Sequence, residues 1–204
     1  MPFVASEKPL FLPEPSEPAF EGVEAVPLLR SPLTEYLKER GIPYAVASRH
    51  CCRLNYGVRG KRYFAVGFPN VSGGYETRSR RFKGCVPPKD VSLVKAGDIP
   101  ADVCSVFEGF MDFLSYQELH RKGDYHVCID RPTDFLVMNS VSNLKKCLVE
   151  LERYTVIHCY LDNDLAGRKT VETIAGLCGN RVTDHSECYY NYKDLNDYLR
   201  GKRR

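Results

Sequence analysis

The stretch TVIHCYLDNDLAGRKTVETIAGLC, residues 155–178, places a strand, an acidic turn and a helix in immediate succession. The apolar run that ends at Asp162 predicts a buried strand, and the spacing of apolar residues over 165–178 predicts a helix with one buried face. Asp162 and Asp164 are two residues apart, so both side chains can point to the same side of the strand end. Such a turn can be a solvated loop, or it can hold a metal ion.

The same strand-then-helix order occurs four times after residue 100, which predicts a parallel sheet covered by helices. Residues 122–133 fit neither pattern and are interpreted as an insertion. The expected strands are 103–108, 134–139, 155–162 and 181–186, and the expected helices are 110–121, 142–153, 165–178 and 193–201.

Glu108 ends the first of these strands and is followed by a glycine. Because ligands of open parallel sheets bind at the carboxyl ends of the strands, Glu108, Asp162 and Asp164 are expected to converge if the first and third strands are neighbours. Three converging acids repel one another unless a cation neutralises them. Mg²⁺, or Mn²⁺, suits carboxylate ligands and leaves positions for phosphate oxygens. Each acidic motif alone can be a solvated turn, but their conjunction favours a metal site.

Residues 25–98 have the pattern of a small α+β unit. Ser31 and Pro32 predict a helix start, and residues 51–70 alternate around Gly60 as a hairpin does. A second turn at Gly73 precedes one further expected strand that carries charge on both faces.

Positive charge is concentrated in this unit. Residues 53–83 have a net charge of +7 with Glu76 as the single acid, so the rest of the +3 chain has a net charge of −4. This asymmetry predicts phosphate binding in one half and cation binding in the other. The eight basic residues are Arg53, Arg59, Lys61, Arg62, Arg78, Arg80, Arg81 and Lys83.

Residues 1–24 are interpreted as a proline-rich linker, because five of the 13 prolines lie within the first 20 residues. A hydrophobic content of 43% without a long apolar run or signal pattern predicts a soluble cytoplasmic protein with no membrane contact. The nine cysteines form no C-x-x-C pair, so they are interpreted as reduced structural residues. No G-x-x-x-x-G-K-[ST] motif occurs, so the sequence encodes no P-loop helicase engine.

The motifs VFEGFMD, residues 106–112, and YLDNDLAGRKT, residues 160–170, resemble the two signature motifs of the Toprim domain, which topoisomerases and bacterial primases share. Primases carry E-G-Y-M-D and D-G-D-x-A-G-R, whereas this chain has Phe110 and Asn163 at the differing positions. Asn tolerates unusual backbone angles, so the loop is expected to keep its shape. Residues 62–84 resemble the amino-terminal half of a primase catalytic core.

This resemblance implies the fold class, an α/β Toprim domain over residues 99–204 preceded by a small basic α+β lobe over 25–98. It also implies roles for particular side chains. Asp112 can be a metal ligand or an ordinary helix-start acid, and Asp194 can extend the acidic cluster. The implied catalytic residues are Glu108, Asp162 and Asp164; the metal ligands are these three with Asp112; the nucleic-acid or nucleotide contacts are Arg78, Arg80, Arg81, Lys83, Lys61, Arg62 and Lys193.

The implied activity is Mg²⁺-dependent nucleotidyl transfer that makes RNA primers from NTPs on single-stranded DNA. The resemblance is closest to small Toprim proteins of conjugative and mobilisable elements, which implies a role in replication or transfer of such an element, with a helicase or relaxase acting in trans. A zinc-ribbon module usually comes first in such proteins and is not found in this sequence. Two alternatives remain open: a non-catalytic accessory that binds single-stranded DNA, and a metal-dependent Toprim nuclease.

Overall fold

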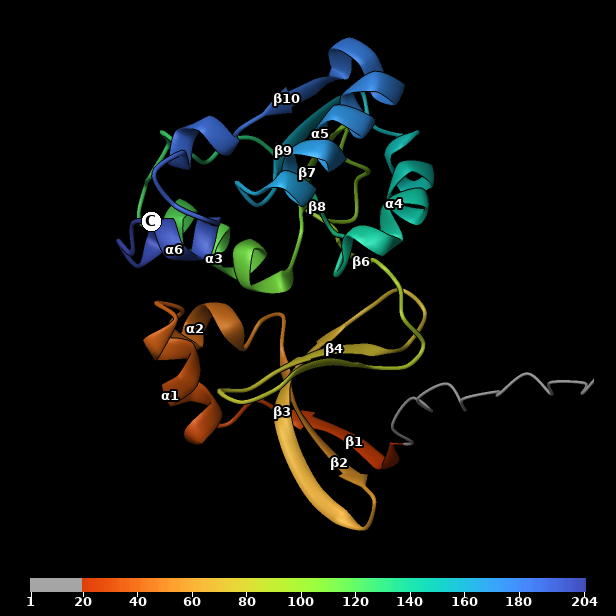
Figure 1. Ribbon diagram of the computed structural model, residues 1–204, viewed down its shortest axis with the longest axis vertical. Helices are drawn as coiled ribbons and strands as arrows, with labels where there is room; N and C mark the ends of the chain where they lie inside the picture. Colours follow the sequence, from red (N-terminus) through yellow and green to blue (C-terminus); the bar gives the residue numbers. More distant parts are fainter. Residues whose placement is uncertain (1–19) are drawn as a thin grey trace, which may run out of the picture.

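The computed structural model describes residues 20–204, which form two five-stranded sheets, one in an N-terminal lobe and one in a C-terminal domain (Figure 1). The lobe sheet is antiparallel in the order β1-β2-β3-β4-β5. Its elements are β1 (Glu21–Pro27), α1 (Pro32–Glu39), α2 (Tyr44–Ala47), β2 (Cys52–Val58), β3 (Lys61–Pro69), β4 (Tyr75–Arg78) and β5 (Lys83–Val86).

The lobe confirms the expected hairpin and corrects the expected linker boundary. β2 and β3 pair from Val58 and Lys61 outward, and the two residues between them, Arg59 and Gly60, have φ values of 50° and 71° as a tight hairpin turn requires. β1 pairs with β2, so residues 21–24 belong to the lobe sheet rather than to a linker. The remainder of the expected linker, residues 1–19, lies outside the described residues.

The single charged strand expected after Gly73 is wrong, because the chain reverses within it. β4 ends at Arg78, β5 begins at Lys83, and the Ser79 N–H donates to the Phe82 carbonyl at 2.9 Å across the turn between them. Residues 79–82 are called the basic turn from here on. Arg80 and Arg81 therefore lie in the turn, and Arg78 and Lys83 flank it as the last residue of β4 and the first residue of β5.

The C-terminal sheet has the order β10-β9-β7-β8-β6, with the first four strands parallel and β6 antiparallel at one edge. β7 and β9 pair directly, as the convergence of the acids requires. The elements are β6 (Ser92–Val94), β7 (Val103–Phe107), α3 (Phe110–Arg121), β8 (Asp134–Val137), a 3₁₀ turn (Val141–Asn143), α4 (Leu144–Leu151), β9 (Val156–Tyr160), α5 (Leu165–Cys178), a 3₁₀ turn (Gly179–Arg181), β10 (Val182–Asp184), a 3₁₀ turn (Ser186–Tyr189) and α6 (Leu195–Leu199).

The structure of this domain also bears on the expected end of the lobe and on the expected insertion. β6 pairs with β8, so residues 92–94 belong to the C-terminal sheet and not to the lobe, which was expected to extend to residue 98. The expected insertion at 122–133 contains no helix or strand. It is nevertheless attached to the core, because the hydroxyl of Tyr160 donates to the Val127 carbonyl at 2.9 Å.

The C-terminal sheet is the middle of three layers. Alternate residues of each strand face opposite sides, so Phe107 and Tyr160 pack toward α3 whereas Val106 and Cys159 pack toward α4 and α5 (Figure 1). This alternation explains why the strands read as continuous apolar runs, since both faces are covered. None of the helices within residues 20–204 combines the length and the apolar character that crossing a bilayer demands.

The lobe and the C-terminal domain share one apolar core. Phe68 of β3 stacks on Phe110 of α3 with ring centroids 5.1 Å apart and an interplanar angle of 8°. α1 and α2 contribute to the same cluster from the lobe, where they lie next to α3 (Figure 1). Because buried packing joins them, the two parts hold the walls of the space between them in a fixed relation.

Candidate active site

Three carboxylates come together at the carboxyl edge of the C-terminal sheet. Asp112, Asp162 and Asp194 each offer an oxygen atom, and these atoms lie within 4.8 Å of one another. Asp162 follows β9, Asp112 is in the first turn of α3, and Asp194 is the N-cap residue of α6. Among residues 20–204 this is the one such group of His, Cys, Asp or Glu side chains, and it is called the acidic cluster below.

Burial and mutual repulsion make the carboxyl groups of this cluster hard to ionise together. Burial, followed by the charge of Asp194, raises the pKa of Asp162 to about 6. The same two causes raise the pKa of Asp112 well above its ordinary value. Carboxylates pushed this close are stabilised by any cation that enters between them, so the cluster is suited to bind one.

Glu108 lines the same cleft beside the cluster. Its Oε2 atom is buried and has no hydrogen-bond partner in the described structure. Burial, Asp162 and Asp164 together raise the pKa of Glu108 to about 7. A divalent cation such as Mg²⁺ would give this buried oxygen a partner, and Mg²⁺ prefers the carboxylate oxygens that lie nearby. The residues therefore fit the cofactor that the sequence predicted.

Asp164 lies outside the acidic cluster, at the start of α5. Its Oδ1 accepts hydrogen bonds of 3.0 Å from the N–H groups of Ala166 and Gly167, which makes it the N-cap of α5. Gly167 is required there, because a Cβ atom on it would lie 2.0 Å from the carbonyl oxygen of Asp162. Asp164 therefore shapes the loop and adds negative charge near Glu108, while Asp112 and Asp194 complete the acidic cluster.

One lysine neutralises part of this charge. Lys193 Nζ lies 3.5 Å from Oδ2 of Asp162. The charge of Asp162 is the main reason that the pKa of Lys193 is raised, so the lysine is fully protonated at neutral pH. Lys193 leads directly into Asp194, so one short segment supplies both a cation and an acid to the site.

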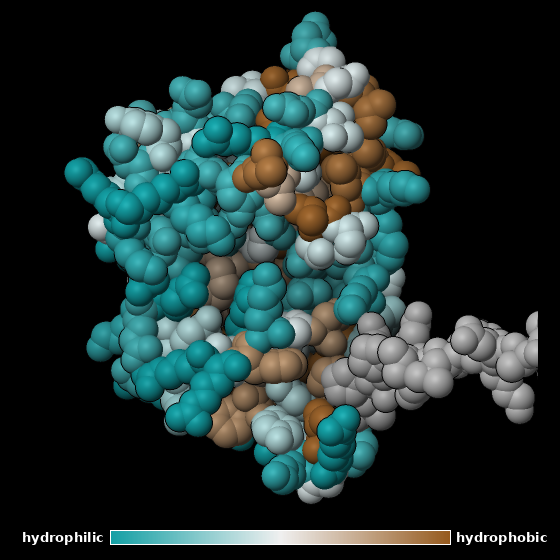
Figure 2. Space-filling view, viewed as in Figure 1, coloured by the Kyte–Doolittle hydropathy of each residue, from teal (hydrophilic) through white to brown (hydrophobic). Residues whose placement is uncertain are grey.

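The opposite wall of the cleft is cationic and comes from the lobe. A cleft of about 650 Å³ separates it from the acidic cluster. The wall comprises Arg40, Arg78, Arg80, Arg81 and Lys83. Arg80 is paired with Glu39 in an exposed ion pair, whereas Arg78 is partly buried, and this burial lowers its pKa below the ordinary arginine value. In Figure 2 the surface at the junction of the two parts is mainly hydrophilic, and hydrophobic residues gather instead over α4 and α5.

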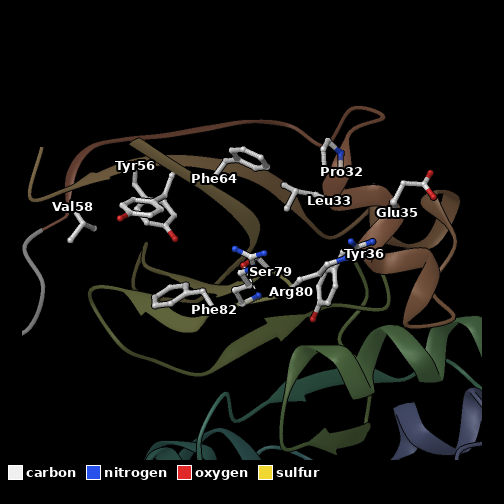
Figure 3. A pocket seen from close by; sticks show the side chains of 12 residues that line it. Pro32, Leu33, Glu35, Tyr36, Tyr56, Val58, Phe64, Ser79, Arg80 and Phe82 are labelled. Carbon is white, nitrogen blue, oxygen red and sulfur yellow. Dashed lines mark hydrogen bonds between the residues drawn. The ribbon is translucent and has the colours of Figure 1, made fainter. Parts of the chain in front are cut away.

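An aromatic groove of about 910 Å³ continues from this cleft along the lobe. Tyr36 and the basic turn line both spaces. Figure 3 shows Tyr56, Phe64 and Phe82 directed into the groove from opposite sides. Phe64 and Phe82 remain 42% and 39% exposed, so their rings are available for contact with a ligand.

The structure brings most predicted basic residues to the cleft but not all. Lys61 and Arg62 stand at the start of β3, at the far end of the hairpin, and line a separate small cavity of about 170 Å³. Arg78, Lys83 and Lys193 do line the cleft. The sequence could not separate these groups, because charge density along the chain does not show which end of a strand faces a partner domain.

Asn196 and Arg40 were not identified from the sequence. Asn196 is fully buried, its side chain accepts from Arg40 Nε at 2.6 Å and donates to the Arg40 carbonyl at 2.8 Å, and its N–H donates to Asp112 at 3.2 Å. It therefore links the end of α1 to the acidic cluster. An asparagine at an apolar position of a short helix is the signal that could have revealed it.

Comparisons with known proteins agree with this geometry. Residues 105–199 match the family model described as Toprim-like, and residues 23–87 match the model described as Domain of unknown function (DUF8464). No curated protein matches the chain. The C-terminal part is therefore a Toprim-like domain, as the sequence motifs predicted.

Three solved structures resemble most of the chain. The primase fragment of the bacteriophage T7 primase-helicase protein is 20% identical with a TM-score of 0.54, and the alignment covers 92% of this chain and 79% of that one. The primase domains of two gp4 subunits bound to an RNA/DNA hybrid and dTTP, seen with the T7 lagging-strand DNA polymerase, give 19% identity, a TM-score of 0.50, and coverage of 88% and 89%.

The Aquifex aeolicus primase, with its zinc-binding and RNA polymerase domains, is 15% identical with a TM-score of 0.53, and the alignment covers 86% of this chain and 54% of that one. The lobe and the Toprim-like domain together thus have the fold of primase catalytic fragments.

Proposed function

We propose that this protein is a divalent-cation-dependent nucleotidyltransferase that synthesises RNA primers on single-stranded DNA. One observation carries the proposal: the acidic cluster and a cationic wall face each other across a cleft of about 650 Å³. Phosphoryl transfer requires positioned phosphates and neutralised charge more than covalent help from the protein. A site with carboxylates on one side and guanidinium and ammonium groups on the other meets both requirements.

The residues of the site have different proposed roles, which follow from their positions and charges. Asp112, Asp162 and Asp194 would hold Mg²⁺, which when bound supplies charge neutralisation at the phosphates. Lys193 and Lys83 add fixed positive charge from two sides of the cleft. Glu108 lines the same cleft and has a carboxylate oxygen without a hydrogen-bond partner, so it is placed to take a proton from an attacking 3′-hydroxyl.

The aromatic groove offers a path for the template. Unpaired bases stack on exposed aromatic rings, and nearby cations hold the backbone, in proteins that bind single strands. Phe64 and Phe82 provide rings, and Arg81 of the basic turn stands where the groove meets the cleft. We infer that single-stranded DNA lies in the groove and reaches the acidic cluster past this turn.

Incorporation of labelled NTPs on single-stranded DNA tests the activity. The wild-type protein is expected to form short RNA with Mg²⁺ or Mn²⁺, and the double variant Asp162→Ala, Asp164→Ala is expected to form none while remaining folded by circular dichroism. Equal synthesis by the double variant contradicts the proposal. Degradation of the DNA without added NTPs would identify a nuclease instead, and cation-independent DNA binding without any product would identify an accessory protein.

We also propose that the protein acts beside a helicase or relaxase supplied in trans, during replication or transfer of a mobile element. One of the similar structures is the primase fragment of a primase-helicase protein. Stimulation of primer synthesis by a helicase or relaxase encoded on the same element would support this assignment, and absence of both stimulation and binding would contradict it.

A further inference from the structure

Asn163, the residue between the two aspartates of the motif, is attached to a segment 23–30 residues further along the chain. It is 7% exposed. Its backbone N–H donates to the Lys193 carbonyl at 2.7 Å. Its side-chain Nδ2 lies within hydrogen-bond distance of three carbonyl oxygens, those of Ser186 at 3.1 Å, Tyr189 at 3.1 Å and Tyr192 at 3.2 Å. Two amide hydrogens thus serve three acceptors that precede Lys193 and Asp194.

This attachment is not a consequence of unusual backbone angles, which the sequence suggested as the reason an asparagine is tolerated here. Among the described residues other than glycine, φ is positive at Arg59 and Asn139 and not at Asn163. The side chain is what this position requires. Glycine, which primases carry here, would leave three carbonyls without this donor, and aspartate would place carboxylate oxygens against carbonyl oxygens.

Sheet pairing does not place Lys193 and Asp194 at the site. The pairing of β10 with β9 ends at Asp184, and the chain then passes through a 3₁₀ turn before α6. One more contact attaches this segment to the strand end that carries Asp162, since the hydroxyl of Tyr189 donates to the Leu161 carbonyl at 2.9 Å. The guanidinium of Arg204, which lies after α6, donates to the Asn163 carbonyl. Asn163 is the centre of this attachment.

We propose that Asn163 is a positioning residue that holds Lys193 and Asp194 against Asp162 and thereby sets the divalent-cation affinity of the acidic cluster. The inference rests on the proposed function only in that the cluster binds a cation; it does not depend on which reaction follows. A partner that orients metal ligands typically contributes about 10- to 100-fold in metal affinity. Asn163 contacts the backbone of residues 186–193, which precede Asp194. It therefore affects the position of the Asp194 carboxylate and does not change the charge of the acidic cluster.

Mn²⁺ binding to the metal-free protein, measured by electron paramagnetic resonance without nucleotide, tests this directly. Asn163→Gly is expected to weaken Mn²⁺ affinity by about tenfold or more, and hydrogen exchange over residues 186–196 is expected to become faster while exchange in α4 stays unchanged. Asn70→Ala is the matched control, because Asn70 is also buried, also holds a turn through its side chain and lies in the lobe away from the cluster. It is expected to lower the melting temperature and leave Mn²⁺ affinity unchanged.

A double-variant cycle shows whether Asn163 acts through Asp194. In an Asp194→Asn background, Asn163→Gly is expected to cost less affinity than it does in the wild type. If Asn163→Gly fails to fold, Asn163→Ser, which keeps one donor, is expected to give an intermediate loss. Mn²⁺ affinity within twofold of wild type in a destabilised variant overturns the proposal, as does absence of Mn²⁺ binding by the wild type. Normal Mn²⁺ binding without primer synthesis overturns the proposed function instead.

Discussion

The two walls of the cleft carry opposite charge and are built in opposite ways. On the acidic wall, Asp162 follows a buried strand, while Asp112 and Asp194 stand at helix starts where backbone N–H groups fix their carboxylates. On the cationic wall, Arg80 and Arg81 project from a turn and are largely solvated. The acidic wall therefore acts through charges that are held in fixed positions, whereas the charges of the cationic wall are less fixed. Substitutions on the two walls should therefore differ in size and in salt dependence.

The largest effect is expected from Asp162→Asn, which keeps the size of the side chain and removes one negative charge from the acidic cluster. Primer synthesis measured with labelled NTPs should fall by at least about 100-fold, because transition-state charge is no longer neutralised in place. The control Asp98→Asn removes an equal charge from an exposed position outside the cleft and should be close to wild type. Activity within threefold of wild type in Asp162→Asn would show that the negative charge at this position of the acidic wall does not matter.

A smaller effect is expected from Phe82→Ala in the aromatic groove. Stacking of one base on an aromatic ring contributes about 1–3 kcal/mol, so affinity for single-stranded DNA should fall by roughly fivefold or more. Fluorescence anisotropy with a labelled oligonucleotide measures this, and Tyr125→Ala removes an exposed ring outside the groove as a control. Equal affinities for the two variants would place the DNA elsewhere.

A still smaller effect is expected from Arg81→Ala, and it should depend on salt. Loss of one phosphate contact should lower the slope of log affinity against log salt by about 0.7 for a single strand. Lys61→Ala removes the same charge at the far end of the hairpin and should leave the slope unchanged. If Lys61→Ala had the larger effect on the slope, the sequence assignment of Lys61 would be right and the cleft would not be the main binding surface.

The smallest effect is expected on the stability of the metal-free protein as a function of pH. The pKa values of Glu108 and Asp162 are raised in the folded state to about 7 and about 6, so the folded state binds more protons than the unfolded state between roughly pH 4 and 7. The stability that these groups contribute is present at low pH and lost as pH rises through this window. Thermal melts should show a shallower fall in Asp162→Asn than in wild type, and added Mg²⁺ should oppose the fall. An equal fall in both proteins would show that this group does not carry the effect.

The sequence predicted the helices well where the spacing of apolar residues along the chain determines them. Helices 110–121 and 165–178 lie where the sequence predicted them, because apolar spacing and sharp loop boundaries determine them. The predicted extent of the lobe was less accurate, since β1 is exposed along most of its length and β6 has three residues, so neither strand has a clear apolar pattern. Pairing across a sheet, which places β6 beside β8, depends on contacts that are distant in the sequence.

The candidate site was predicted in part. Strand-end logic identified Glu108 and Asp162, and both line the cleft. The sequence pattern could not show that Asp194, and not Asp164, belongs to the acidic cluster. Asp164 is close to Asp162 in sequence but caps a helix, whereas Asp194 is distant in sequence and is brought near through the contacts of Asn163. Which acids form the cluster is therefore a property of tertiary contacts.

The position of a bound cation can be located in crystals of the protein soaked in Mn²⁺, which give an anomalous signal at the metal. We expect a peak coordinated by oxygens of Asp112, Asp162 and Asp194, on the side of the cleft that faces Arg78, and loss of this peak in Asp162→Asn. A peak elsewhere, or no peak among these carboxylates at saturating Mn²⁺, would contradict the central claim that this cluster is the metal centre of a primase-like site.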